Sequence, residues 1–194
     1  MTSTLVSEAG KVGLRINKKK TKVMAISRKT KAKISIGTES IEEVDHFQYL
    51  GSCITKEGGT DTDIHMRLGK ATALFRKMSK IWQDKMFRKE VKIRLFNTII
   101  IPTAIYAGDT WKDSNKTAHQ LNTFQQRCLR KILNISYSSK TTNEEVLIRS
   151  GSHRLADTVT ERRMRLAGHI LRLPDHRYAK SVLNWTPPGG KRKQ

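Results

Sequence analysis

Three pairs of acidic residues are the parts of this sequence that could bind a catalytic metal ion. They are Glu42 with Glu43, Glu144 with Glu145, and Asp61 with Asp63. Phosphoryl transfer by two metal ions needs carboxylates that converge on cations about 4 Å apart. Adjacent acids diverge on a strand or share the first turn of a helix, and helix capping accounts for the third pair. The sequence therefore predicts no metal site, and we expect no cofactor in this chain.

Histidine and cysteine offer no better catalytic arrangement. The six His are spread singly, without an HExxH pattern and outside any recognisable Ser or Cys nucleophile motif. Cys53 and Cys128 are the only cysteines, whereas a structural zinc site needs about four ligands. We expect two small buried thiols in a reducing compartment. No self-contained active site is predicted.

Lysine and arginine supply the chemistry that this sequence favours, which is binding to a polyanion. The chain has 38 Lys and Arg against 17 Asp and Glu, a formal charge of +21. Phosphate contacts need only cations and hydrogen-bond donors on a rigid frame. In "GLRINKKKTKVM", residues 13–24, four lysines lie at a predicted strand turn, with Asn17 and Thr21 as uncharged donors. The predicted nucleic-acid-binding residues are Lys18, Lys19, Lys20, Lys22, Arg67, Lys70, Arg76, Lys77, Lys80, Arg127, Arg130 and Lys131.

A solvated charge surface and an anionic membrane are the alternatives to a nucleic-acid partner. Solvation alone explains any one lysine, so the prediction rests on the whole set. The longest apolar stretch, "TIIIPTAIYAG", is about ten residues long and contains Pro102, whereas a membrane span needs about 20. The segment "MTSTLVSEAG" has no charged region followed by an apolar block. We expect no membrane partner and an intracellular protein, cytoplasmic or nuclear and not secreted.

The hydrophobic patterns predict an α+β fold, with a small, mostly antiparallel β region before a helical one. Leu5, Ala9 and Val12 recur at helical spacing, and Gly13 follows where a left-handed C-cap is expected. The runs "LRIN", "TKVMAI", "KISIGTESIEEV" and "FQYLGSCIT" then read as extended segments around turns. We expect the β region to end near Thr55.

The chain after residue 60 has helical periodicity. Asp61 is the expected N-cap of the first helix, and Pro102 should end or kink the second. Thr142, Glu145 and Gly151 predict a capping box and a C-cap around a short helix. The expected apolar stripes are, in order, Ile64, Leu68, Ala71, Phe75, Met78 and Trp82; Val91, Leu95 and Ile99; Leu121, Phe124, Cys128 and Ile132; and Leu155, Val159, Leu166, Ile170 and Leu173.

The order of several segments resembles a known family. "LVSEAGKVGLRINKKKTKVM", a hairpin, and then "HFQYLGSCIT" are similar to the downstream part of the palm in reverse transcriptases of LINE-type (non-LTR) retrotransposons. "IIPTAIYAGDTW", "FQQRCLRKILNIS", "TNEEVL", "RRMRLAGHILRLP" and "LNWTPPGGKRK" resemble segments that follow the polymerase domain in these elements. The resemblance covers nearly the whole chain, and it implies descent from an RNA-directed DNA polymerase that also carries an endonuclease domain.

The resemblance also implies roles for single residues. "INKKKT" is similar to a palm motif beside the incoming nucleotide, and Lys20 matches its lysine, a candidate proton donor to the leaving pyrophosphate. Phe47, Tyr49, Leu50 and Gly51 match the hairpin called the primer grip, which holds the primer end. The helices after Thr60 would correspond to the thumb and the C-terminal region, which embrace the template-primer duplex.

The catalytic part of the family has no counterpart in this sequence. The Tyr-Ala-Asp-Asp strand, an earlier metal-binding Asp, the fingers and the endonuclease all belong upstream, so Mg²⁺ is expected only for the complete parent enzyme. We expect a palm remnant over residues 1–56, a helical thumb and C-terminal region over 57–184, and a basic disordered tail over 185–194. The expected partners are RNA or an RNA/DNA hybrid, bound without sequence preference, and the missing upstream part of the polymerase.

Two other interpretations of the whole chain stay open. It could be a basic nucleic-acid-binding protein adopted by its host, in which case sequence-selective binding is expected. It could also be an inert translated relic of the parent enzyme, in which case molten behaviour and aggregation are expected. In each case the chain alone is expected to be inactive as a polymerase.

Overall fold

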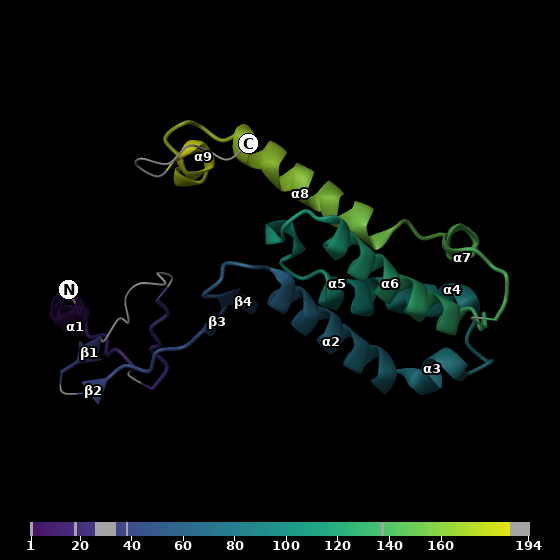
Figure 1. Cartoon of the computed structure of the whole chain (residues 1–194), viewed down its shortest axis with the longest axis horizontal. Helices are drawn as coiled ribbons and strands as arrows, with labels where there is room; N and C mark the ends of the chain where they lie inside the picture. Colours follow the sequence, from purple (N-terminus) through teal and green to yellow (C-terminus); the bar gives the residue numbers. More distant parts are fainter. Residues whose placement is uncertain (1, 18, 26–33, 38, 137, 187–194) are drawn as a thin grey trace. The chain divides into compact units, whose positions relative to one another are not determined.

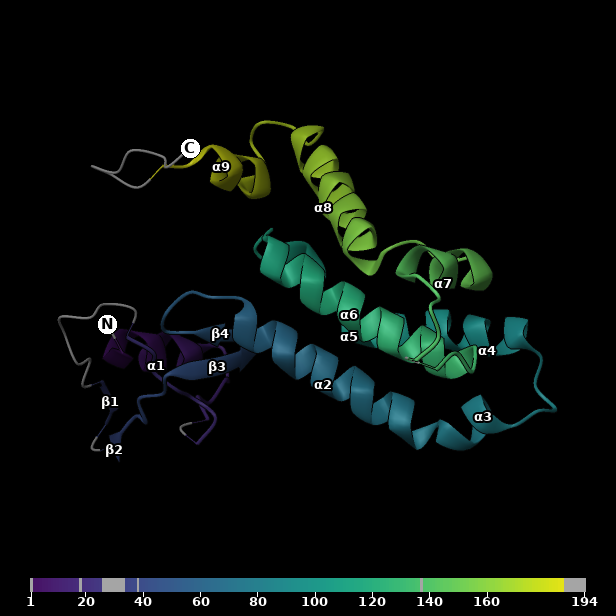
Figure 2. The same cartoon turned by 45° about the vertical axis from the view of Figure 1, so that its right-hand side comes forward.

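The computed structural model describes residues 2–17, 19–25, 34–37, 39–136 and 138–186. The chain forms two compact units, Met1–Met66 and Arg67–Gln194. Two small antiparallel sheets lie in the first unit, and helices make up the second (Figures 1 and 2). The α+β class that the hydrophobic patterns predict is confirmed.

The first unit opens with helix α1, Thr2–Lys11. Gly13 follows the helix with a φ of +75°, and the N–H of Leu14 donates to the carbonyl of Ala9 at 2.9 Å. This arrangement is a left-handed helix ending, which glycine adopts without a steric penalty. The predicted helix and its glycine C-cap are therefore confirmed, although Leu5 and Val12 are exposed.

Two hairpins form the β region. Strand β1 (Ser35–Ile36) pairs with β2 (Glu39–Ser40), and β3 (His46–Tyr49) pairs with β4 (Ser52–Thr55), both antiparallel. The β region ends at Thr55 as predicted. The segments "LRIN" and "TKVMAI" were expected to be extended, but in their described residues only an isolated bridge from Val23 to Glu43 forms. The end of "TKVMAI" lies outside the described residues.

The turn between β3 and β4 has only two residues, and one of them is a leucine in a backbone conformation that usually holds glycine. Leu50 and Gly51 both have positive φ angles, 48° and 85°. Two consecutive positive φ values characterise the type I′ turn, whose twist matches that of the flanking strands. Glycine occupies this region freely, whereas a leucine there brings its Cβ against the backbone. Leu50 is therefore held in a strained conformation.

Helix α2, Asp61–Lys77, begins one residue earlier than predicted, so Asp61 is not its N-cap. Asp61 is its first helical residue, and the carbonyl of Thr60 accepts the N–H of Ile64 at 3.0 Å. Asp63 is buried and accepts the backbone N–H of Cys53 at 2.8 Å. Its carboxylate therefore ties the second hairpin to the helix, a role that the capping interpretation did not include.

The single helix predicted through Trp82 is wrong, because α2 ends at Lys77 and a separate helix, α3 (Ser79–Gln83), follows. The indole N–H of Trp82 donates to the carbonyl of Phe75 at 2.7 Å, and the two rings stack at 4.9 Å. In a continuous helix, that carbonyl would accept the N–H of the residue four positions later. The indole N–H of Trp82 bonds to this carbonyl in place of a backbone N–H, which accounts for the break at Met78.

The second predicted apolar stripe is also wrong. The chain runs continuously through α4 (Lys89–Leu95), the π-helical turn η1 (Phe96–Ile100) and α5 (Ile101–Ala104). Pro102 lacks an N–H and its ring would press on the preceding turn, and the wider π turn accommodates both effects. Val91 and Ile99 are exposed, so the predicted stripe does not face the core. The buried apolar residues are Ile93, Phe96, Ile100 and Ala104.

Helix α6, Asn115–Ile132, is the centre of the second unit and packs against α3, α4, α7 and α8 (Figures 1 and 2). Ser114 caps its start by accepting the N–H of Thr117 at 3.2 Å. The predicted apolar stripe of this helix is confirmed, since all four of its members are buried. These are Leu121, Phe124, Cys128 and Ile132.

The C-terminal helices are predicted only in part. Helix α7, Asn143–Ser150, has the predicted capping box between Thr142 and Glu145, and Gly151 ends it with a φ of 59°. Helix α8, Leu155–Leu171, buries its first two stripe residues, Leu155 and Val159, but its Leu166 is exposed. Helix α9, Tyr178–Asn184, was not predicted. Most of the basic tail, residues 187–194, lies outside the described residues.

Candidate nucleic-acid interface

A cationic surface follows from the sequence of α2 and α3. Residues 64–83 contain five Lys and Arg and no Asp or Glu. The buried side chains of Ala71, Phe75 and Trp82 fix the inner side of these helices. Four cations are exposed and make no ion pair with any described residue. They are Lys70, Arg76, Lys77 and Lys80, which we call the α2–α3 basic face.

Arg67 does not belong to this face, although the sequence placed it there. It is only 8% exposed, and its guanidinium carbon lies 4.3 Å from the centre of the Tyr106 ring. A guanidinium over a tyrosine ring is a favourable cation–π contact. The helical wheel missed this role because it shows angular position and not the neighbour that covers it. Arg67 is a packing residue and is not available to a phosphate.

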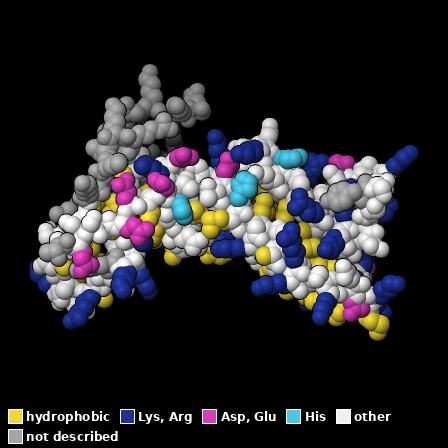
Figure 3. Space-filling model, turned by 60° about the horizontal axis from the view of Figure 1, so that its bottom comes forward, with side chains coloured by type: hydrophobic (Ala, Val, Ile, Leu, Met, Phe, Trp, Pro, Cys, Tyr) yellow, Lys and Arg dark blue, Asp and Glu magenta, His cyan; other side chains and the backbone are white. Residues whose placement is uncertain are grey.

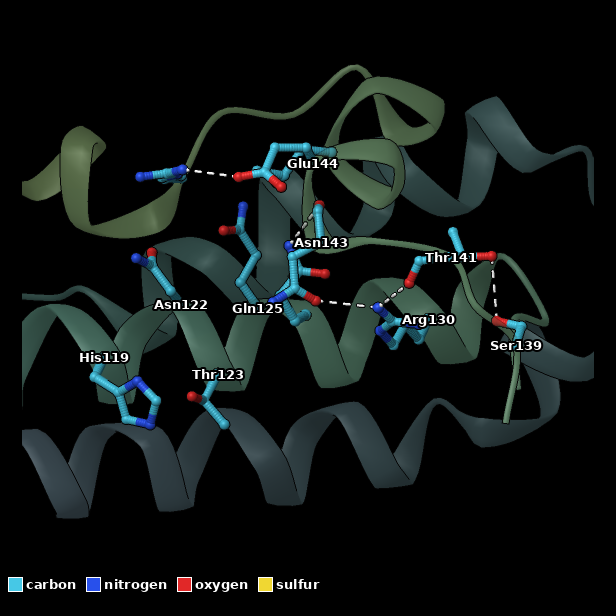
Figure 4. Close-up of a pocket in the computed structure, with 12 residues that line it drawn as sticks. His119, Asn122, Thr123, Gln125, Arg130, Ser139, Thr141, Asn143 and Glu144 are labelled. Carbon is cyan, nitrogen blue, oxygen red and sulfur yellow. Dashed lines mark hydrogen bonds and ion pairs between the residues drawn. The ribbon is translucent and has the colours of Figure 1, made fainter. Parts of the chain in front are cut away.

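Arg130 is likewise taken up inside the fold. It is 7% exposed, and its Nη2 donates to the carbonyl of Thr141 at 2.9 Å and to Oδ1 of Asn143 at 3.0 Å (Figure 4). The guanidinium thereby fixes the segment that leads into α7. Arg127 and Lys131, the other two cations predicted on this helix, are exposed. Of these three predicted residues, Arg130 therefore has a structural role, and Arg127 and Lys131 lie on the surface.

A polar pocket of about 470 Å³ lies beside Arg130. Amide side chains that line it join α6 to the chain around α7 (Figure 4). Gln125 donates to the carbonyl of His153 at 2.7 Å and accepts the N–H of Leu155 at 2.9 Å. Gln126 donates to the carbonyl of Asn143 at 3.1 Å. Neither glutamine stands out in the sequence, because polar residues give no hydrophobic period and only their place beside Phe124 indicates burial.

The lysine-rich segment of the first unit presents fewer free cations than predicted. Lys19 and Lys20 are exposed, whereas Lys22 forms an ion pair with Glu42. Lys18 lies outside the described residues. The two predicted uncharged donors serve the turn itself. Asn17 Oδ1 accepts the N–H of Lys20 at 3.1 Å, and the hydroxyl of Thr21 donates to the Asn17 carbonyl at 2.9 Å.

The four residues matched to the primer grip lie together on the β3–β4 hairpin. Phe47 is half-buried opposite Ile54 in the register of the two strands. Tyr49 and Leu50 are 58% and 78% exposed, and they stand with Gly51 at the turn. Because the side chain of Leu50 is exposed, no burial of apolar surface offsets the strain of its backbone. Backbone strain of this kind is found most often at functional sites of proteins.

Two ionisable groups of the described residues, Cys128 and Asp175, have shifted pKa values. Burial raises the pKa of the Cys128 thiol to about 12, against the opposing effect of the Arg127 and Lys131 charges. The hydrogen bond and charge of Lys180 lower the pKa of the Asp175 carboxyl. Among the described residues, no three His, Cys, Asp or Glu side chains gather as metal ligands would. What the exposed groups offer is ionic and stacking contact.

No helix in the described part of the chain has both the length and the apolar character to cross a membrane.

Comparisons with known proteins give one informative match. No protein-family profile matches the chain, and no solved structure does. An uncharacterized protein of Caenorhabditis elegans, named as transposon-derived, is 26% identical over 200 residues, covering 99% of this chain and 71% of the worm protein. The similarity extends over both units and is consistent with a transposon-related origin.

Proposed function

We propose that the chain derives from the reverse transcriptase of a LINE-type retrotransposon and binds RNA or RNA/DNA hybrids without sequence preference. The first unit would be the remnant of the palm, and the second would be the thumb and the region after it. The exposed lysines and arginines would contact phosphates, so the chain would hold a template-primer without acting on it. Mg²⁺ and polymerisation belong to the part of the parent enzyme that carries the catalytic carboxylates.

The α2–α3 basic face is the observation that carries this proposal. Its four cations lie within residues 64–83, which contain no Asp or Glu. The buried aromatic side chains on the opposite side of the helices hold these helices in place. Phosphate contacts of this kind supply most of sequence-independent affinity for nucleic acid. A surface meant only for solubility would be expected to mix charges of both signs.

Two further observations support the polymerase ancestry. The strained and exposed tip of the β3–β4 hairpin, Tyr49 and Leu50, lies where the resemblance expects a primer-contacting hairpin. The worm protein that matches nearly the whole chain is named as derived from a transposon. Neither observation identifies the class of transposon, which rests on the resemblance alone.

Binding to hybrids of unrelated sequence tests the proposal. Fluorescence anisotropy with three labelled RNA/DNA hybrids of equal length should give dissociation constants that agree within about threefold, because backbone contacts carry no sequence information. A preference of a hundredfold or more for one sequence would favour a host-adopted, sequence-selective protein. Absence of binding at low salt would contradict any nucleic-acid role.

A further inference from the structure

A basic pocket lies in the second unit, at the ends of α3 and α6. It has a volume of about 640 Å³, within the range of roughly 300 to 1,000 Å³ typical of ligand sites. None of the described residues that line it is Asp or Glu. Its four cations are Lys85, Lys92, Arg130 and Lys131, and we call it the α3–α6 basic pocket.

Lys92 is the unusual member of this set. It lies on α4, is only 8% exposed, and donates from Nζ to the carbonyl of Trp82 at 2.8 Å. Lys92 makes no ion pair with any residue of the described chain. A buried ammonium without an anionic partner is costly, so such groups are normally paired with a carboxylate or another anion.

The dipoles of two helices account for part of this arrangement. The carbonyl of Trp82 lies in the last turn of α3, and Arg130 and Lys131 lie in the last turn of α6. Cations at a helix C-terminus are stabilised by the helix dipole, but only modestly at exposed positions. That effect is small beside the cost of burying a charge, and it does not explain why Lys85, from the loop between α3 and α4, lines the same space.

The nearest acid in the sequence does not neutralise the pocket. Asp84 precedes Lys85, but it is not among the residues that line the cavity. Its Oδ1 instead accepts the backbone N–H of Met86 at 2.8 Å. The polar side chains that do line the pocket beside the cations include Asn134 and Ser136, which are hydrogen-bond donors. The guanidinium of Arg130 is held by Thr141 and Asn143. Three lysines and the neutral donors around one cavity suit a tetrahedral oxyanion.

We propose that the α3–α6 basic pocket binds a phosphate group, with Lys92 as its buried cation and Lys85 and Lys131 at its exposed rim. The phosphate can come from a nucleic-acid backbone or from a free inorganic ligand, and both offer the same chemistry. Where the phosphate belongs to nucleic acid, the assignment deepens the proposed function and rests on it. This pocket would add one fixed contact to the more diffuse binding by the α2–α3 basic face.

Inorganic pyrophosphate is the probe for this site. Isothermal titration of the full chain at constant ionic strength should show saturable binding to one site. The Lys85→Ala/Lys131→Ala variant should bind at least tenfold more weakly. The control variant, Lys140→Ala/Arg149→Ala, removes the same charge from exposed positions outside the pocket and should bind like the original protein. Equal affinity of both double variants, or no saturable binding by the original chain, overturns the proposal.

Lys92→Met examines the buried cation directly. The variant keeps the long apolar stem and removes the charge, so the unliganded protein should unfold at the same temperature or a higher one. Pyrophosphate should then no longer raise the unfolding temperature. A rise as large as in the original protein would overturn the role given to Lys92. Because Lys85 and Lys131 are exposed, the double variant decides the question even if Lys92→Met does not fold.

Competition with an RNA/DNA hybrid separates the two sources of phosphate. If the hybrid displaces pyrophosphate, the pocket holds a backbone phosphate; if both bind together, it serves a free ligand, and either result supports a phosphate site. Hybrid binding without any pyrophosphate binding would overturn the pocket and leave the proposed function standing. Pyrophosphate binding without hybrid binding would do the reverse.

Discussion

The backbone conformation of Leu50 cannot be read from the hydrophobic pattern of the sequence. The residue types of "FQYLGSCIT" predict an extended segment, and only the family resemblance implies a hairpin there. Nothing in that pattern predicts that the leucine itself has a positive φ of 48°. Only the two-residue spacing between paired Tyr49 and Ser52 forces it into this conformation.

Replacing this leucine should therefore stabilise the hairpin. Leu50→Gly should relieve about 1 kcal/mol of strain, because a left-handed conformation costs an L-residue with a Cβ roughly 1 to 2 kcal/mol. Amide hydrogen exchange along β3 and β4 should become slower. Gly51→Ala, which adds a Cβ at a φ of 85°, is the matched control and should make the same exchange faster. Slower exchange in both variants would contradict the account of strain.

Burial sets the pKa of the Cys128 thiol. Its pKa of about 12 in the folded chain lies above the ordinary value of 9.0. Between these values the unfolded thiol loses its proton while the folded one keeps it. The contribution of Cys128 to stability is therefore complete below pH 9 and is lost as pH rises toward 12.

Chemical denaturation at several pH values tests this linkage. The free energy of unfolding of the original chain should fall more steeply above pH 9 than that of Cys128→Ala, which shares every other titrating group. Parallel curves for the two proteins would contradict the burial of the thiol. Rapid labelling of both cysteines in native buffer would indicate the molten behaviour of an inert relic, since both thiols are buried in the folded chain.

Among the helices, those whose ends have specific chemistry are the ones that the sequence predicts well. The capping box of α7 and the glycine after α1 are local features, and local features are visible in the sequence. The break at Met78 and the π turn before Pro102 are different, because they depend on a tryptophan N–H and on the packing of the whole segment. Such contacts leave no sign in the hydrophobic periodicity of the sequence.

Loss of the capping box should weaken α7 measurably. Thr142→Ala removes the hydroxyl that accepts the N–H of Glu145 at 3.2 Å, and it should lower the free energy of unfolding by about 1 kcal/mol. Urea denaturation followed by circular dichroism gives the value. Glu145→Gln keeps a side-chain oxygen that can reach the Thr142 N–H, so it should lower stability much less. Equal losses in both variants would contradict a reciprocal cap.

Across the whole molecule, the sequence predicts the excess of positive charge but not which cations remain free. Arg67 and Arg130 are buried in packing roles, and Lys22 pairs with Glu42. Lysines and arginines spread over the face shown in Figure 3 remain in contact with solvent. The proposed binding surface thus has fewer free cations than the composition alone suggests, and the α2–α3 basic face is its best-defined part.

The salt dependence of hybrid affinity tests the phosphate-binding claim most directly. The comparison is between the original chain and Lys70→Ala/Arg76→Ala/Lys77→Ala/Lys80→Ala, with Lys140→Ala/Arg149→Ala/Arg162→Ala/Arg177→Ala as the charge-matched control. Each phosphate neutralised contributes roughly 0.7 to 0.9 to the slope of log affinity against log salt. The account predicts a steep slope for the original chain and the control, reduced by about 3 when the basic face is removed. A flat dependence for the original chain, or equal slopes in all three proteins, would contradict it.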